Sequence, residues 1–262
     1  MAEHFITDLH SHILFDIDDG AVTIEESVEM LRMAAQQGVR NVFCASHHWQ
    51  AELSNYDLNF RLLEECVKSE GIDIKLYKGM EILCENDSYL PETLRDIKSG
   101  AAKSLNNTDY VLIEMSPFMT AWEIFECANT IFEQTGKKVV LAHIERYSIL
   151  NGEDEVLQHL KELGCLFQIN AYSLVKEKHD DIRNFARKLL SEKLVDLIGS
   201  DSHRIDHRPP ELLSGVKFIY ENCDKEYADA VCFGNAERLI QNGLFVNSWG
   251  KELKTELSIK QL

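Results

Sequence analysis

Short apolar runs alternate with helix-like segments along this 262-residue chain, and that alternation restricts the fold more than any other feature. It predicts an α/β fold built of βαβ units around a parallel sheet. The expected strands are residues 5–9, 39–45, 74–80, 110–113, 139–142, 165–169 and 195–198. We expect these seven strands to close into a barrel. The alternative is an open doubly wound sheet, but no Gly-rich dinucleotide fingerprint follows the first strand.

Helix signals separate these strands. Thr23 with Glu26 three residues later forms a capping-box pattern, and Gly38 ends the helix that follows. Further helices are expected over residues 58–69, 91–98, 121–134, 153–163 and 182–192, with two or three more closing the chain. A barrel of this length can be one domain, so residues 1–262 are expected to form a single domain.

The composition limits the partners and the compartment. With 44 acidic and 27 basic residues the net charge is −17, and binding to a nucleic acid backbone needs clustered Lys and Arg. Nucleic acid is therefore not an expected partner. No run approaches the roughly 20 apolar residues that cross a bilayer, and no secretory signal is visible, so we expect a cytoplasmic protein without membrane insertion. The seven cysteines are odd in number and include no CxxC pair, which favours reduced thiols.

Metal-binding side chains stand at the end of nearly every expected strand. Catalytic groups of a parallel barrel gather at the carboxyl ends of its strands, so these side chains are expected to meet in one site. Asn170 adds a polar side chain at the end of the sixth strand. The nine candidate ligands are His10, His12, Asp19, His47, Glu81, Glu114, His143, Asp201 and His203.

Two pairs of these ligands, His10 with His12 and Asp201 with His203, are separated by a single residue. Residues i and i+2 of an extended segment point to the same side, so each pair can bind one ion. Mixed imidazole and carboxylate ligands suit Zn, Mn or Fe better than Ca or Mg. Nine ligands exceed what one ion takes, which indicates two or three ions. Ions about 3.5–4 Å apart can clamp a phosphoryl group and activate water.

Six stretches of the sequence resemble a known family: DLHSHILFDIDDG, TIEES, QGVRNVFCASHH, LIEMS, LAHIERY and SDSHRIDHRPP. They are similar to the polymerase-and-histidinol-phosphatase (PHP) superfamily and, within it, to the bacterial manganese-dependent tyrosine-protein phosphatases of capsule and exopolysaccharide operons. The resemblance covers nearly the whole chain. It implies a distorted seven-stranded (β/α) barrel, a cluster of three metal ions, and hydrolysis of phosphotyrosine, notably on the tail of a polysaccharide-synthesis tyrosine kinase.

The resemblance also implies how the ligands divide among three ions. One set is His10, His12, Glu81 and Asp201, a second is Glu81, Glu114 and His143, and the third is Asp19, His47 and His203. Glu81 would bridge the first two ions. Asp18 is an alternative to Asp19, and His48 is an alternative to His47.

Arg146 in HIERY and Arg208 in HRPP follow ligand-bearing strands and are expected to bind phosphate, because a guanidinium fork matches phosphoryl oxygens. In the expected reaction a metal-activated hydroxide attacks phosphorus. The leaving phenolate, with a pKa of about 10, is a tolerable leaving group, and no general acid is assigned. Four aromatic residues near the expected strand ends are candidates to contact an aromatic substrate: Trp49, Tyr56, Phe118 and Trp122.

Three other functions remain open from the sequence. A phosphatase of a small metabolite such as histidinol phosphate would use the same superfamily fold. A metal amidohydrolase would use a similar barrel but has no use for Arg146 and Arg208. A non-catalytic or nuclease-like module is disfavoured by the acidic composition. Manganese is the expected metal through the resemblance, while the ligands alone do not rank Mn, Fe and Zn.

Overall fold

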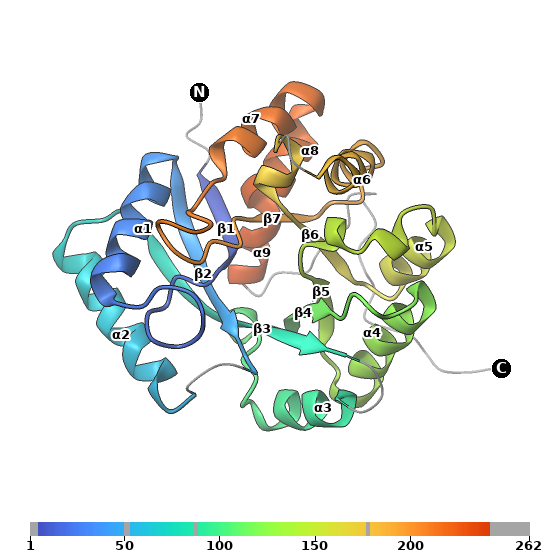
Figure 1. Ribbon diagram of the computed structural model, residues 1–262, viewed down its shortest axis with the longest axis horizontal. Helices are drawn as coiled ribbons and strands as arrows, with labels where there is room; N and C mark the ends of the chain where they lie inside the picture. Colours follow the sequence, from blue (N-terminus) through green and yellow to red (C-terminus); the bar gives the residue numbers. More distant parts are fainter. Residues whose placement is uncertain (1–4, 50–52, 86–88, 177–178, 242–262) are drawn as a thin grey trace.

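A computed structural model describes residues 5–49, 53–85, 89–176 and 179–241. Within them, seven strands form one parallel sheet whose spatial order follows the sequence (Figure 1). The strands are β1 Ile6–Ser11, β2 Val39–His47, β3 Lys75–Cys84, β4 Tyr110–Met115, β5 Lys138–Leu141, β6 Leu166–Asn170 and β7 Leu197–Gly199. The seven expected strands and their parallel arrangement are confirmed.

The sheet curls until β1 meets the segment that follows β7. Ser11 and Ser202 form a parallel bridge, and their hydroxyl oxygens lie 2.8 Å apart. The backbone N–H of His12 donates to the carbonyl of Ser202 at 2.8 Å, and that of Asp201 donates to the carbonyl of His10 at 2.7 Å. The strands therefore form a nearly closed barrel, as expected, and the open doubly wound sheet is wrong. This closure brings the first ligands of the chain beside the last.

Helices surround the barrel (Figure 1). Thr23 accepts a hydrogen bond from the N–H of Glu26 and begins α1, and Thr120 with Glu123 forms a complete capping box at α4. The helices are α1 Ile24–Gln36, α2 Leu53–Ser69, α3 Leu90–Ser99, α4 Ala121–Thr135, α5 Asp154–Glu162, α6 Asp180–Ser191, α7 Leu213–Asn222, α8 Lys225–Asp229 and α9 Asn235–Ile240. Short helical turns are η1 Leu105–Asn107, η2 Ile144–Arg146, η3 Ser148–Leu150, η4 Ala171–Leu174 and the π-type η5 Ala230–Gly234.

The barrel interior changes from apolar to polar along each strand. Side chains on one side of a strand recur at every second residue. Phe43 in β2 and Leu112 in β4 belong to a buried apolar cluster, and later residues on the same side are His47 and Glu114. The same side leads from Tyr77 to Glu81 in β3, from Leu166 to Asn170 in β6, and from Leu197 to Asp201 just after β7. Packing at the amino end thus fixes which side chains face one another at the carboxyl end.

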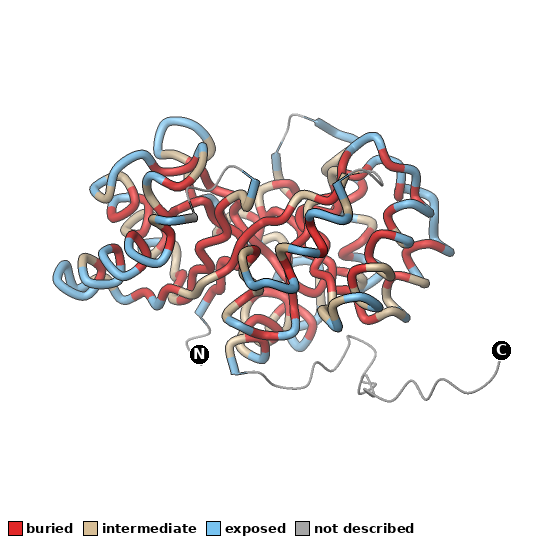
Figure 2. The backbone as a smooth tube through the Cα atoms, turned by 90° about the horizontal axis from the view of Figure 1, so that it is seen from below, coloured by how far each residue is buried: buried red, intermediate tan, exposed pale blue. Residues whose placement is uncertain are grey.

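A second and larger apolar cluster lies between the strands and the helices, with Leu31 of α1, Ile131 of α4 and Leu189 of α6 among its members. Figure 2 shows burial concentrated on the central strands and on the inner turns of the helices, with exposed positions along the outside. None of the helices in the described residues combines the length and apolar character of a bilayer-spanning segment.

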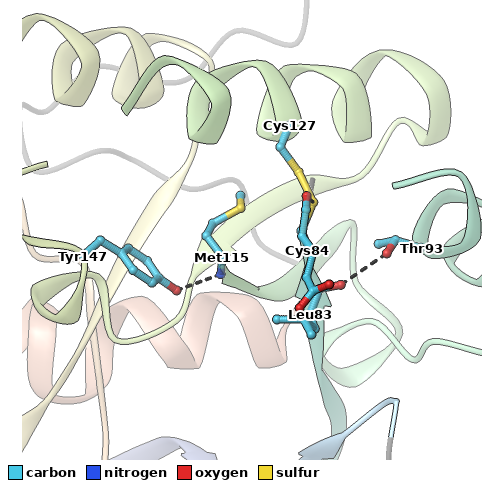
Figure 3. Close-up of a disulfide and its surroundings, with 7 residues drawn as sticks. Leu83, Cys84, Thr93, Met115, Cys127 and Tyr147 are labelled. Atoms are coloured by element: carbon cyan, nitrogen blue, oxygen red, sulfur yellow. Dashed lines mark hydrogen bonds between the residues drawn. A yellow bond between two sulfur atoms is a disulfide. The ribbon is translucent and has the colours of Figure 1, made fainter. Parts of the chain in front are cut away.

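Cys84, the last residue of β3, forms a disulfide with Cys127 of α4 (Figure 3). The expectation that all seven cysteines are reduced thiols is therefore wrong for these two. The physical reason is that β3 continues to residue 84 rather than ending near residue 80, which carries Cys84 to the buried face of α4. The five remaining cysteines are free: Cys44, Cys66, Cys165, Cys223 and Cys232.

Candidate metal centre

The nine candidate ligands meet at the carboxyl ends of the strands. They fall into four overlapping groups, and the ligand atoms within each group lie within 4.8 Å of one another. The groups are His12, Asp19, His47 and His203; His10, His12 and Asp201; His10, Glu81 and His143; and His47, Glu81 and Glu114. Several ligands lie within the strands, because β2, β3 and β4 are longer than the sequence indicated.

His10, His12 and Asp201 form the buried base of the cluster. The Nε2 atoms of His10 and His12 lie 3.1 Å apart, so the two rings point to one side as their spacing predicts. Asp201 Oδ1 lies 3.8 and 3.6 Å from these nitrogens. The ladder between β1 and β2 has a register shift between Asp8 and Ser11. Strict alternation is broken there, so His10 reaches the cluster although Leu9 beside it packs in the interior.

Glu81 connects the base to the rest of the cluster. Its Oε2 lies 3.3 Å from Nε2 of both His10 and His12, and its Oε1 lies 2.9 Å from His143 Nε2. Glu114 Oε1 lies 3.6 Å from the same His143 nitrogen. A single carboxylate therefore belongs to two of the candidate groups.

Asp19 closes the outer side of the cluster. Its Oδ1 lies 3.6 Å from Nε2 of His47 and 3.6 Å from Nε2 of His203. Asp18, the alternative to Asp19 as a metal ligand, is hydrogen-bonded to residues of the cluster instead. Its Oδ2 accepts hydrogen bonds from His12 Nδ1 at 2.8 Å and from the backbone N–H of His47 at 2.7 Å. Asp18 thus orients His12, the arrangement in which a carboxylate fixes a metal-binding imidazole. The other alternative, His48, points to Asp96 on α3, with Nε2 3.5 Å from its Oδ2.

The unpaired atoms of the cluster fit a metal cation. His12 donates from Nδ1 to Asp18, and His10 donates from Nδ1 to the side-chain oxygen Oε1 of Gln168 at 3.2 Å. The Nε2 atom of each ring is therefore left as a lone-pair acceptor. Glu81 Oε2 is buried without a hydrogen bond, although His47 Nδ1 is 2.9 Å away and is also unpaired. Buried polar atoms are nearly always paired, and imidazole nitrogens facing carboxylate oxygens are the donor set of a divalent transition metal.

Several pKa shifts within the cluster also favour a metal cation. Burial and the neighbouring Arg146 lower the pKa of His143 to about 4, and burial with the nearby His12 lowers the pKa of His203 to about 3. Burial thus favours the neutral form of these two rings, which is the form that binds a metal. At His10 and His12 the neighbouring carboxylates outweigh burial and raise the pKa. Burial and the charge of Glu81 raise the pKa of Glu114 to about 7. Carboxylates crowded in this way are relieved by a cation.

Two arginines join the cluster at one oxygen. Arg146 Nη2 donates to Asp201 Oδ2 at 2.6 Å, and Arg208 Nη1 donates to the same oxygen at 3.1 Å. Their side chains remain 28% and 32% exposed, whereas Asp201 is buried. Each guanidinium thus keeps N–H groups at the mouth of the barrel, where an anion can enter.

Polar side chains of β6 form hydrogen bonds to residues of the cluster. The side-chain oxygen Oε1 of Gln168 accepts hydrogen bonds from the backbone N–H of His143 at 2.8 Å and from His10 Nδ1. The side-chain nitrogen Nε2 of Gln168 donates to Asn170 Oδ1 at 3.1 Å. Asn170 in turn donates to Asp201 Oδ2 at 3.0 Å. Asn170 stood out in the sequence at a strand end. Gln168 was not identified as a site residue from the sequence. Its position two residues before Asn170, on the same side of the strand, could have indicated that it faces the site.

The four aromatic candidates occupy different environments. Tyr56 is fully buried, and its hydroxyl donates to the carbonyls of Cys44 and Gly79. Trp122 packs against Phe125 and His159, and Phe118 is 94% exposed. Trp49 is the one whose ring meets the cluster, with 4.1 Å between its centroid and that of His47. Tyr56 is therefore excluded as a substrate contact because it has no exposed surface.

Comparisons with known proteins identify the family. A family model described as "Capsular polysaccharide synthesis, CpsB/CapC" matches residues 6–241. The tyrosine-protein phosphatase CpsB of Streptococcus agalactiae serotype V is 32% identical over 244 residues, which are 90% of this chain and 98% of the relative. The tyrosine-protein phosphatase YwqE of Bacillus subtilis strain 168 is 29% identical over 247 residues, 90% of this chain and 91% of the relative.

Solved structures share the architecture. One from work on YwqE of Bacillus subtilis and CpsB of Streptococcus pneumoniae, described as unique metal-dependent tyrosine phosphatases, matches with a TM-score of 0.80 at 26% identity over 95% of this chain and 100% of that one. A phosphotriesterase homology protein of Escherichia coli matches at a TM-score of 0.56 and 14% identity over 92% of this chain and 100% of that one, which shows the fold alone. The resemblance seen in the sequence is confirmed: the chain belongs to the CpsB/CapC family of capsular polysaccharide synthesis.

Proposed function

We infer that the chain is a metal-dependent protein-tyrosine phosphatase, a phosphoric monoester hydrolase formed by one catalytic domain over residues 1–262. One observation carries the inference: nine converging ligands border two half-exposed arginines that meet at Asp201 Oδ2. Full-length relatives named as tyrosine-protein phosphatases and a metal-dependent solved relative support the same reaction.

The nine side chains are proposed to hold two or three divalent ions, and Glu81, which belongs to two of the candidate groups, would be shared. Manganese is the proposed metal, and iron or zinc is the alternative, since imidazole and carboxylate ligands suit all three. Bound ions supply Lewis-acid stabilisation of the phosphoryl oxygens and an activated water at neutral pH. Asp18, Gln168 and Asn170 keep the ligand side chains oriented through the hydrogen bonds already described.

Arg146 and Arg208 are proposed to bind the phosphoryl group. Both guanidiniums donate to the same oxygen of Asp201, so their remaining N–H groups can contact different oxygens of one phosphate. Charge develops on these oxygens during transfer, and fixed donors stabilise it without reorganisation. The Asp201 carboxylate holds both arginines in place before the substrate arrives.

The proposed substrate is phosphotyrosine on a cytoplasmic protein of capsule or exopolysaccharide synthesis, such as the tail of a tyrosine kinase. Family membership in capsular polysaccharide synthesis supports this assignment. Trp49 is proposed to contact the substrate ring, because it is 41% exposed and stacks on His47 at the edge of the cluster.

A kinetic comparison tests the proposed function. The purified protein is assayed on a phosphotyrosine peptide, an alkyl phosphate such as histidinol phosphate, and an amide substrate, each with and without chelator. We expect hydrolysis of the phosphotyrosine peptide that is lost with chelator and restored by Mn²⁺. A preference for the alkyl phosphate would favour the small-molecule phosphatase, and turnover of the amide alone would favour an amidohydrolase.

A further inference from the structure

Tyr172 lies at the mouth of the barrel beside the proposed phosphate site. It belongs to η4, which follows β6 directly, and its side chain is half-buried. The hydroxyl oxygen accepts a hydrogen bond from Arg146 Nη2 at 2.7 Å and a longer one from Asn170 Nδ2 at 3.4 Å. Among the residues that the structure describes, no acceptor takes the proton of this hydroxyl. Tyr172 therefore has a proton to donate at the mouth.

The phenol oxygen is close to the position of the reacting group. The same Nη2 of Arg146 that donates to Tyr172 also donates to Asp201 Oδ2 at 2.6 Å. The Tyr172 hydroxyl oxygen and the Asp201 carboxylate are therefore both hydrogen-bonded to a single nitrogen of Arg146. A phosphoryl group bound by Arg146 would thus bring its ester oxygen within reach of the Tyr172 hydroxyl.

The backbone around Tyr172 is held in place by a buried carboxylate. Glu145 Oε1 accepts the N–H of Asn170 at 3.0 Å and the hydroxyl of Ser173 at 2.8 Å, one on each side of Tyr172. Lys176 Nζ lies 4.8 Å from the centroid of the Tyr172 ring. The hydroxyl is therefore positioned before substrate binds, which a proton donor requires.

We propose that Tyr172 is the general acid that protonates the leaving tyrosyl oxygen, an inference that depends on the proposed phosphatase function. Water attacks phosphorus, the bond from phosphorus to the tyrosyl oxygen breaks, and both electrons of that bond leave with the oxygen. Tyr172 gives this oxygen its proton, so the tyrosine departs neutral. The proton lost by the attacking water passes to solvent, and a solvent proton restores Tyr172. One water is consumed for each ester.

His10, His12 and Arg146 are less suited to this step. His10 and His12 have both ring nitrogens occupied, with Nδ1 donating to Gln168 and Asp18 and Nε2 facing the cluster. Arg146 remains charged, so its N–H groups bind oxygen but do not transfer a proton. These N–H groups, with that of Asn170, already donate to the Tyr172 oxygen and stabilise the charge that proton transfer leaves there.

The test compares Tyr172→Phe with the wild type on esters whose leaving groups differ. A phenolate of ordinary basicity needs the proton, whereas 4-nitrophenolate departs readily without it. We expect kcat on phenyl phosphate and on a phosphotyrosine peptide to fall about 10²-fold, and kcat on 4-nitrophenyl phosphate to change by less than about threefold. An equal loss on all three esters would overturn the proposal, because it would mean that Tyr172 only positions Arg146.

Two further measurements separate the role in proton transfer from structural effects. Tyr220→Phe is the matched control, since it removes a hydroxyl that donates to Asp229 on the outer helices, and it should leave all three rates unchanged. Affinity for inorganic phosphate and metal content should be the same in Tyr172→Phe as in the wild type. Weaker phosphate binding with uniform rate loss would count against the proposal. A metal-loaded wild type that hydrolyses none of the esters would instead remove the phosphatase function on which it depends.

Discussion

Gly199 of β7 lies so close to His10 of β1 that residue 199 has no room for a side chain. A Cβ atom placed on residue 199 would lie 2.6 Å from His10 Cβ and 3.0 Å from both the His10 nitrogen and Gln168 Nε2. Real Cβ atoms do not approach this closely, so something must shift. The nearest atoms belong to His10, a proposed metal ligand, and to Gln168, whose side chain accepts a hydrogen bond from it. Close strand packing and ligand placement therefore depend on the same glycine.

Gly199→Ala is expected to lose metal and activity while the barrel still folds. The added methyl displaces His10, and disturbing the support of a ligand typically costs about 10–100-fold in metal affinity or activity. Calorimetric titration of Mn²⁺ measures the first effect. Gly234→Ala in η5 is the control, because its Cβ would come no nearer than 3.4 Å to any atom outside its helix turn. Unchanged Mn²⁺ affinity in Gly199→Ala would contradict the dependence of metal binding on close packing at residue 199.

Arg146→Lys and Arg208→Lys are expected to keep their metal but lose kcat/KM by about 10²–10³-fold each. A lysine preserves the charge but not the planar fork that contacts a phosphoryl group and Asp201 together. Steady-state kinetics on a phosphotyrosine peptide, beside elemental analysis, measures both properties. Arg61→Lys on the outer face of α2 is the control. Kinetics equal to the wild type in either site variant would remove that arginine from the phosphate site.

Trp49→Ala is expected to raise KM for phosphotyrosine peptides by up to about tenfold, since an aromatic contact contributes about 0.5–1.5 kcal/mol. The effect on an alkyl phosphate should be small because no ring is present to stack. Trp122→Ala, which removes a ring packed against Phe125 and His159, is the matched control. If the two substrates respond equally to Trp49→Ala, Trp49 does not select for an aromatic ester.

Reduction of the disulfide is expected to destabilise the protein by about 2–4 kcal/mol, because Cys84 and Cys127 close a loop with a sequence separation of 43. Urea unfolding with and without reductant measures the difference, and Cys84→Ser should reproduce it. Cys66→Ser, which alters a free cysteine, should not. If reductant leaves the unfolding midpoint of the wild type unchanged, the two cysteines are not paired in solution.

The sequence predicted the seven strands and the nine side chains that converge at their ends because both follow from local signals. Apolar runs mark buried strands, and residues such as His47 and Glu114 follow the apolar positions on the same side of their strands. Barrel closure then brings the ends of the strands together without any information on individual contacts.

Features that depend on tertiary contacts could not be predicted in the same way. The length of β3, and with it the pairing of Cys84 with Cys127, depends on how far β4 lies beside it. The choice between Asp18 and Asp19 depends on which carboxylate turns inward beneath His12. Tyr172 gains its importance only from Arg146, which is far from it in the chain.

We propose that the clustered imidazoles and carboxylates hold the metal ions needed for phosphotyrosine hydrolysis. Elemental analysis of the purified wild type beside Glu81→Gln and His203→Ala, with activity measured on the same samples, tests it most directly. We predict two or three divalent ions per wild-type chain, and loss of metal and of most activity in both variants with the circular dichroism spectrum unchanged. Full activity in wild-type protein shown to be free of metal would contradict the account.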